Sequence, residues 1–95
     1  MKNSNNMVDG NEEFLPMIEK YVSQILSEGN YENPIQILQF LGFDDDVITL
    51  NYDCETNLYY VIDFYKNNIG LTTLEEAFKK YQVIKRYYYR IKHSE

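Results

Sequence analysis

The sequence predicts an all-α fold, in which short N-terminal helices pack on a C-terminal unit of three helices. Apolar residues recur at spacings of three and four over much of the chain, which is the period of an amphipathic helix. Glycine and asparagine residues separate these periodic stretches, as they commonly do at helix ends. Thr72 and Glu75 have the spacing of a capping box, which marks the start of a helix.

The N-terminal part of the chain divides into a tail and an acidic pair of helices. Residues 1–12 are polar and show no apolar period, so we expect a disordered tail ahead of one small helical domain at 13–95. The pair of helices occupies 13–43, and Pro16 suits the first turn of its first helix. Asn33–Pro34 predicts the cap and the first residue of its second helix.

Residues 58–92 are expected to form the three-helix unit. The second helix of this unit has the small residue Ala77 where two helices would cross closely. Gln82 and Val83 are expected to form the turn, with Val83 as an apolar plug beneath it. The third helix follows at 84–92. The inward-facing residues of these two helices are expected to recur at helical spacing and are Leu74, Ala77, Phe78, Tyr81, Ile84, Tyr88 and Ile91.

One segment leaves two structures open. Apolar and polar side chains alternate over 47–54, which is typical of a strand. A short β-hairpin over 47–64 would then replace the first helix of the three-helix unit. The helical period at 58–65 favours a helix or an extended loop over the hairpin.

The run AFKKYQVIKRYYYR, from Ala77 to Arg90, resembles the homeodomain-like helix-turn-helix of the pipsqueak and transposase–resolvase type. The resemblance is confined to the C-terminal part of the chain. Gln82 replaces the usual Gly or Asn of the turn, and Tyr87 and Tyr88 replace smaller residues. The positions that match the family pattern are Ala77, Tyr81, Val83, Lys85, Arg86, Tyr89 and Arg90.

This resemblance implies a protein that binds double-stranded DNA, with the helix at 84–92 in the major groove. Lys85 and Arg86 would reach base edges or phosphates, because both lie near the start of that helix. The expected DNA-binding residues are Lys79, Lys80, Lys85, Arg86, Tyr87, Tyr89, Arg90 and Lys92. One module of this size binds weakly, so we expect a homodimer that serves as a transcriptional regulator or a mobile-element factor.

The distribution of charge supports a second interpretation. The net charge is −6, but residues 1–65 hold two Lys and twelve Asp or Glu, whereas residues 66–95 hold seven Lys or Arg and three Glu. Such asymmetry indicates two surfaces with different tasks, unless the two halves simply attract each other. The alternative function is an acidic protein–protein interaction module, such as a phage-type inhibitor or an immunity-like protein. Its acidic N-terminal half would bind a partner protein, whereas the DNA interpretation requires the basic residues of 85–92 to be exposed on one face.

Residues with catalytic or metal-binding chemistry are few. Cys54 and His93 are the only Cys and His, and no phosphate-binding glycine loop or nucleophile motif is present. The acidic run 44–46 lacks the alternating ligands of a calcium loop, and an acidic capping turn is the simpler interpretation. We therefore expect a protein that is not an enzyme and needs no cofactor or metal.

No apolar run reaches the roughly 18 residues of a membrane span, and the N-terminus lacks the apolar segment of a signal peptide. These features predict no membrane partner and an intracellular location. That location would be the cytoplasm of a prokaryote or a virus-infected cell, or the nucleus of a eukaryote.

Overall fold

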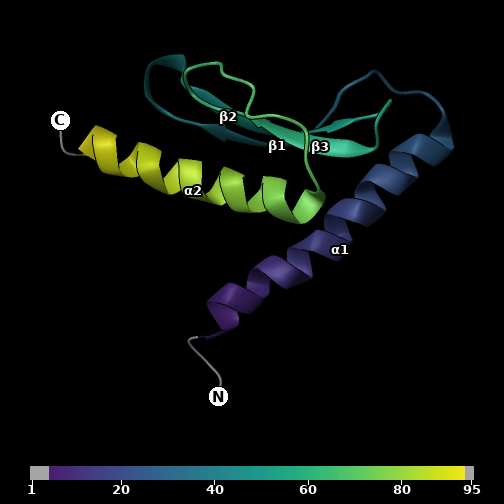
Figure 1. Ribbon diagram of the computed structural model, residues 1–95, viewed down its shortest axis with the longest axis horizontal. Helices are drawn as coiled ribbons and strands as arrows, with labels where there is room; N and C mark the ends of the chain where they lie inside the picture. The colour runs from purple at the N-terminus through teal and green to yellow at the C-terminus, as the bar shows by residue number, and fades with distance from the viewer. Residues whose placement is uncertain (1–4, 94–95) are drawn as a thin grey trace. The chain divides into compact units, whose positions relative to one another are not determined.

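The computed structural model describes residues 5–93, with side chains described at 14–92, and it shows an α+β fold (Figure 1). The prediction of an all-α fold is therefore wrong. The chain divides into two compact units, Met1–Tyr31 and Glu32–Glu95. The elements in chain order are α1 (Asn5–Glu28), β1 (Ile35–Leu41), a 3₁₀ turn (Phe43–Asp45), β2 (Val47–Asp53), β3 (Leu58–Ile62) and α2 (Leu74–His93).

The first unit consists of the helix α1. This helix already includes residues 5–12, which were expected to belong to a disordered tail, while residues 1–4 lie outside the described part of the chain. Pro16 consequently lies inside the helix and not in its first turn. Gly29 has a φ of 74° and donates its N–H to the Leu26 carbonyl at 3.2 Å, which is how a helix commonly ends.

The second unit contains an antiparallel sheet in the order β1-β2-β3. The central row of side chains is set by the register, which pairs Leu38 with Leu50 and Leu50 with Val61. The helix predicted after Asn33–Pro34 is absent, and β1 stands in its place. A short apolar run of this kind fits either structure, and pairing with β2 decides in favour of the strand.

The hairpin that the sequence left open near 47–64 forms from β2 and β3, so the helix favoured at 58–65 is wrong. Its turn is held by Asp53, whose carboxylate accepts hydrogen bonds from the Thr56 N–H at 3.0 Å and the Thr56 hydroxyl at 2.6 Å. Asn57 takes a left-handed conformation with φ of 62°. Cross-strand pairing outweighs the helical period here because Tyr59 and Val61 become buried on one face of the sheet.

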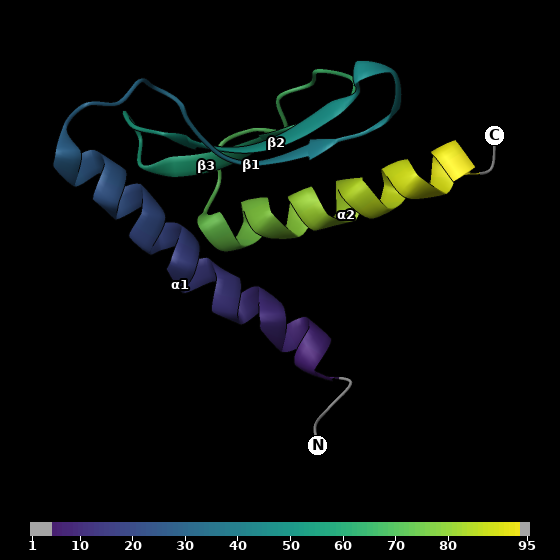
Figure 2. The same cartoon turned by 180° about the vertical axis from the view of Figure 1, so that it is seen from behind.

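The C-terminal part forms one continuous helix, α2, so the prediction of a helix-turn-helix is also wrong. Figures 1 and 2 show α2 lying along one face of the sheet. Gln82 and Val83 lie inside the helix, and Val83 is 57% exposed because it faces away from the sheet. The buried residues of α2 recur at helical spacing and are Leu74, Ala77, Phe78, Tyr81 and Tyr88.

The start of α2 differs from the predicted capping box by one residue. The Thr73 hydroxyl, and not that of Thr72, accepts a hydrogen bond from the helix, namely from the Glu76 N–H at 3.3 Å. Thr72 instead pairs with Tyr59 beside the sheet. The chain therefore leaves the edge of the sheet after Thr72 and continues directly into α2, which lies on the face of the sheet.

Candidate protein-interaction site

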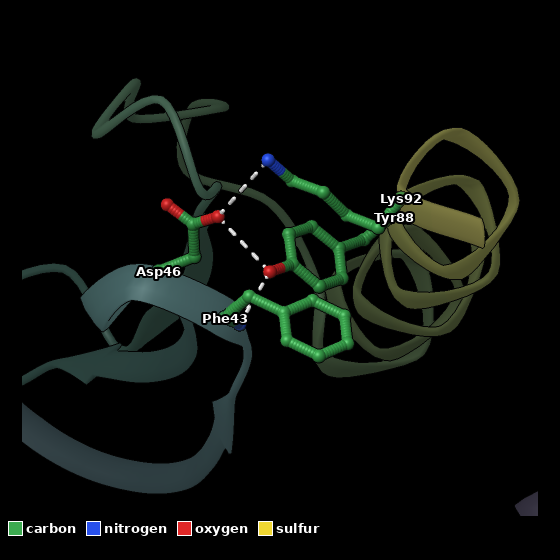
Figure 3. Close-up of polar contacts among 4 residues, drawn as sticks. All are labelled: Phe43, Asp46, Tyr88 and Lys92. Atoms are coloured by element: carbon green, nitrogen blue, oxygen red, sulfur yellow. Dashed lines mark hydrogen bonds and ion pairs between the residues drawn. The ribbon is translucent and has the colours of Figure 1, made fainter. Parts of the chain in front are cut away.

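Tyr88 is the side chain that joins the last part of α2 to the turn between β1 and β2 (Figure 3). It is 1% exposed and lies among three phenylalanine rings. Its ring centroid is 5.7 Å from that of Phe40 in an edge-on arrangement, 6.3 Å from that of Phe43 in a stacked one, and 4.8 Å from that of Phe64, again edge-on. These rings come from β1, from the turn and from the segment after β3, so Tyr88 holds three separate parts of the unit together.

The Tyr88 hydroxyl fixes both ends of the turn. It accepts a hydrogen bond from the Phe43 N–H at 2.6 Å and donates one to Asp46 Oδ2 at 2.9 Å. Figure 3 shows these two bonds converging on the hydroxyl, with Lys92 Nζ reaching the same Asp46 oxygen at 3.7 Å. The phenol therefore acts as donor and acceptor at once.

Burial raises the pKa of Tyr88, and the hydrogen bond to Asp46 and the negative charge of that carboxylate raise it further. The Phe43 N–H and the Lys92 ammonium act in the opposite direction but do not outweigh burial. Tyr88 consequently stays protonated near neutral pH. A proton held in this way serves the fold, because the same O–H anchors the turn.

Gly42 allows the close approach of Tyr88 to the chain. A Cβ atom at this position would overlap the Tyr88 hydroxyl and the adjoining ring carbon atoms. The Gly42 N–H donates to the Asp46 carbonyl at 2.8 Å, and the Asp46 N–H donates to the Phe43 carbonyl at 2.8 Å. The backbone of the turn is thus closed by its own hydrogen bonds as well as by Tyr88.

The apex of this turn, which we name the acidic turn (41–46), has an uncommon backbone. Asp44 and Asp45 follow each other in the left-handed region, with φ of 53° and 68°. A non-glycine residue costs about 1–2 kcal/mol in that region, although aspartate tolerates it better than most. Such a conformation persists only where surrounding contacts hold it, which is what Tyr88 and Gly42 provide.

The acidic turn also exposes large apolar side chains. Phe43 stacks one side of its ring on Tyr88 and is still 54% exposed. Leu41 is 68% exposed at the end of β1, in the position that pairs with Val47. Asp44 and Asp45 are exposed between Phe43 and β2. One end of the sheet therefore presents aromatic, aliphatic and acidic groups on a fixed backbone.

All eight residues predicted for DNA binding lie on α2, but they do not share one face. Lys79, Arg86 and Arg90 are exposed and follow at intervals of seven and four, which places them on the side of the helix away from the sheet. Tyr87 and Tyr89 are exposed on the two flanks of this stripe, near Phe64 and Phe40 respectively.

The other three predicted residues, Lys80, Lys85 and Lys92, are only partly exposed. Lys85 Nζ lies 5.8 Å from the Phe40 ring centroid and 5.2 Å from that of Tyr81, which is cation–π geometry. Lys92 lies near Asp46 and 5.8 Å from the Tyr88 ring centroid. Two of the basic residues of 85–92 are thus engaged within the fold.

Gly42, Phe43 and Tyr88 are not predicted from the sequence to form one site. The run 44–46 was interpreted as a capping turn, and Tyr88 as a core residue of a third helix. The signal that could have indicated a turn is the Gly-Phe-Asp-Asp-Asp sequence between two seven-residue segments that mix apolar and polar side chains, Ile35–Leu41 and Val47–Asp53. The contact with Tyr88 has no local signal, because the two residues joined by its hydrogen bond are 45 positions apart.

Two further observations on residues 14–92 concern groups that could take part in reactions or bind a metal ion. Partial burial raises the pKa of the Cys54 thiol, and Asp53 and Glu55 raise it further, so this thiol is protonated near neutral pH. Within the described part of the chain, no group of three or more His, Cys, Asp or Glu residues is arranged to hold a metal ion. Neither α1 nor α2, as far as they are described, combines the length and the apolar character needed to cross a membrane.

Comparisons with protein-family models, with curated proteins and with solved structures found no match to this chain. Its function is therefore inferred from its own geometry.

Proposed function

We propose that this protein is a non-enzymatic interaction module, and that the acidic turn (41–46) binds a partner protein with a basic surface. The observation that carries this proposal is that the turn is both exposed and held in place. Phe43 is half exposed although Tyr88 supports its ring and binds its backbone N–H. An exposed apolar residue that is held from behind is suited to binding, because little conformational freedom is lost when a partner covers it.

A fixed turn binds more tightly because less conformational freedom is lost on association. The hydrogen bonds from Tyr88 and within the turn already fix the backbone of residues 42–46. An aromatic side chain on such a backbone is typical of the few residues that dominate an interface. Phe43 is the anchor in this proposal, and Leu41 extends the apolar contact at the end of the sheet.

The charge of the chain defines the class of partner. Asp44 and Asp45 are exposed beside Phe43, and the whole chain has a net charge of −6. Opposite charge on the partner would accelerate association and fix its orientation, while the apolar contact supplies most of the affinity. A basic protein surface with an apolar depression meets both requirements.

The proposal is tested by selecting peptides from a random library displayed on phage against the full chain. Enriched peptides are expected to combine Lys or Arg with an apolar residue. Their binding should fall at least about tenfold with Phe43→Ser, as expected for an anchor residue. It should weaken less, and become less dependent on salt, with Asp44→Asn and Asp45→Asn combined, because asparagine keeps the left-handed backbone and removes the charge.

Matched control variants are available on α2. Arg86→Ala and Arg90→Ala remove exposed positive charges that lie outside the acidic turn, so they should leave peptide binding unchanged. Selection of acidic peptides whose binding requires Arg86 and Arg90 would contradict the proposal. Salt-dependent binding of a random 20-base-pair duplex that requires the same two residues would contradict it as well, and would support DNA as the partner.

A further inference from the structure

The sheet of the second unit has one open edge, the outer side of β1. β2 pairs with the inner side of β1 over Ile35–Leu41. Among residues 32–93, no backbone group pairs with the outer side of this strand. An edge of this kind presents unpaired N–H and C=O groups that can bind another strand.

The opposite edge of the sheet, the outer side of β3, is covered by another segment of the chain. Tyr59 and Thr72 exchange two backbone hydrogen bonds of 2.8 Å, and the Ile69 N–H donates to the Val61 carbonyl at 2.9 Å. The segment that leads from β3 to α2 thus runs along β3 and covers its outer side, as Figure 2 allows the reader to follow. Within residues 32–93, β1 is therefore the one strand that keeps an edge able to accept a new strand.

The residues of β1 carry none of the charges that usually protect an edge strand. The strand reads IQILQFL, and it lies within 33–43, the longest stretch of the chain without a charged residue at eleven positions. Lysine and proline are the common guards of such edges, and neither occurs within this strand. Its one protective feature is an irregularity between Gln36 and Leu38.

We infer that the outer edge of β1 binds the same edge of a second copy of this chain. The two strands would run antiparallel across a two-fold axis and join two three-stranded sheets into one of six strands. Each copy has a net charge of −6, so association is favoured where like charges do not meet. The uncharged β1 provides that place, while a basic partner would find no opposite charge on it.

The expected dimer is weak. A contact made by one pair of edge strands buries less than a standard interface of about 1,600 Å². We expect the dimer to have a dissociation constant between about 10 µM and 1 mM. The dimer should therefore form as the concentration of the chain rises through this range.

Sedimentation velocity of the full chain over about 5 µM to 1 mM tests this inference. The wild type should shift from monomer to dimer, and Gln39→Lys should raise the dissociation constant at least about tenfold, because it places a like charge on the uncharged edge strand of both copies. Gln24→Lys makes the same substitution at an exposed position of α1 and should behave as the wild type. Melting curves of both variants check that the fold is kept.

Hydrogen exchange of the unmodified chain gives a second measurement that needs no variant. Amide protection in 35–41 should increase with concentration, while protection of β3 amides should stay constant. A wild type that remains monomeric at 1 mM, or a dimer that Gln39→Lys does not weaken, would overturn the inference. Concentration-dependent protection confined to α1 would also overturn it, because the interface would then lie on the helix.

Discussion

The acidic turn (41–46) and the outer face of α2 are both exposed and charged, but they differ in how firmly their groups are held. In the acidic turn, Tyr88 fixes the backbone, and Phe43 stands half exposed on that support. On the outer face of α2, the charges of Lys79, Arg86 and Arg90 stand on long side chains directed to solvent. The acidic turn is therefore organised before binding, and the helix face would have to be organised by its partner.

This difference shows why charge alone is a poor guide to a binding surface. Burying a Lys or Arg side chain costs up to about 2 kcal/mol in lost rotamer freedom. The acidic turn avoids much of that loss, because Asp44 and Asp45 have short side chains on a closed backbone. Solvated basic stripes are common on helices that pack by their other face, and α2 packs on the sheet in that way.

The largest expected effect comes from a substitution that unfolds the second unit, because both surfaces depend on its fold. Ala77 is completely buried where α2 packs, and Ala77→Asp would place an unpaired carboxylate there. The free energy of unfolding should fall by on the order of 3–5 kcal/mol, which is comparable with the whole stability of a small domain. Thermal melting followed by circular dichroism measures this fall.

Val83→Asp is the control for that substitution, because it adds the same charge to the exposed side of the same helix. Its free energy of unfolding should change by no more than about 0.5 kcal/mol. Equal effects at both positions would show that α2 does not bury Ala77 against the sheet.

A smaller effect is expected from Gly42→Ala, which acts on the acidic turn alone. The added methyl group would overlap the Tyr88 hydroxyl and ring, so either the turn or the side chain must move. Overpacking of this kind lowers the free energy of unfolding by about 1–3 kcal/mol. A double-mutant cycle with Tyr88→Leu measures the coupling, since the smaller side chain should relieve most of the clash. Additive effects would separate Gly42 from Tyr88.

The local sequence of α2 predicts which of its faces is buried, but not the element on which that face packs. Leu74, Ala77, Phe78 and Tyr88 were expected to face inward, and all four are buried. The helical period thus identified the correct face over most of α2. The period did not predict whether this face packs on a sheet or on two further helices. Both kinds of packing require the same apolar stripe on an amphipathic helix.

The remaining errors arise from contacts between distant residues. The run at 35–41 fits a short helix or a strand, and only pairing with β2 selects the strand. Val83 was expected to lie inside a turn between two helices, and it is exposed because α2 continues through it. The support of Phe43 by Tyr88 depends on both the strand and the continuous helix, so the site could not be predicted before the fold was known.

A further prediction concerns the pH dependence of the Tyr88 contact. Burial raises the pKa of Tyr88 above the ordinary value of about 10, so the folded chain holds this proton more tightly than the unfolded chain. The stability contributed by this proton is fully present below about pH 10 and is lost as pH rises through the folded-state pKa. The difference in melting temperature between the wild type and Tyr88→Phe should therefore be constant near neutral pH and shrink above pH 10.

Tyr88→Phe keeps the ring contacts and removes both hydrogen bonds, which makes it a specific probe of the turn. The Phe43 amide should exchange its hydrogen faster in this variant, while amides at the centre of β2 should be little affected. Because Tyr60 and Tyr81 also have raised pKa values, comparison with Tyr88→Phe is needed to isolate the contribution of Tyr88. A difference that stays constant up to pH 12 would show that the hydroxyl is not held as described.

The smallest expected effect concerns the outer face of α2. Arg86 and Arg90 are both exposed, and replacing either by Ala should change the free energy of unfolding by no more than about 0.5 kcal/mol. If this face is only solvated, neither variant should alter binding of peptides or of duplex DNA, measured by fluorescence anisotropy at two salt concentrations. If it is a phosphate-binding surface, the wild type should bind duplex DNA with strong salt dependence, and each substitution should lower the slope of log K against log salt by about one unit. If the acidic turn is the binding surface, no binding of duplex DNA and hence no such slope is expected. A salt titration of the wild type with duplex DNA therefore decides which of the two surfaces binds a partner.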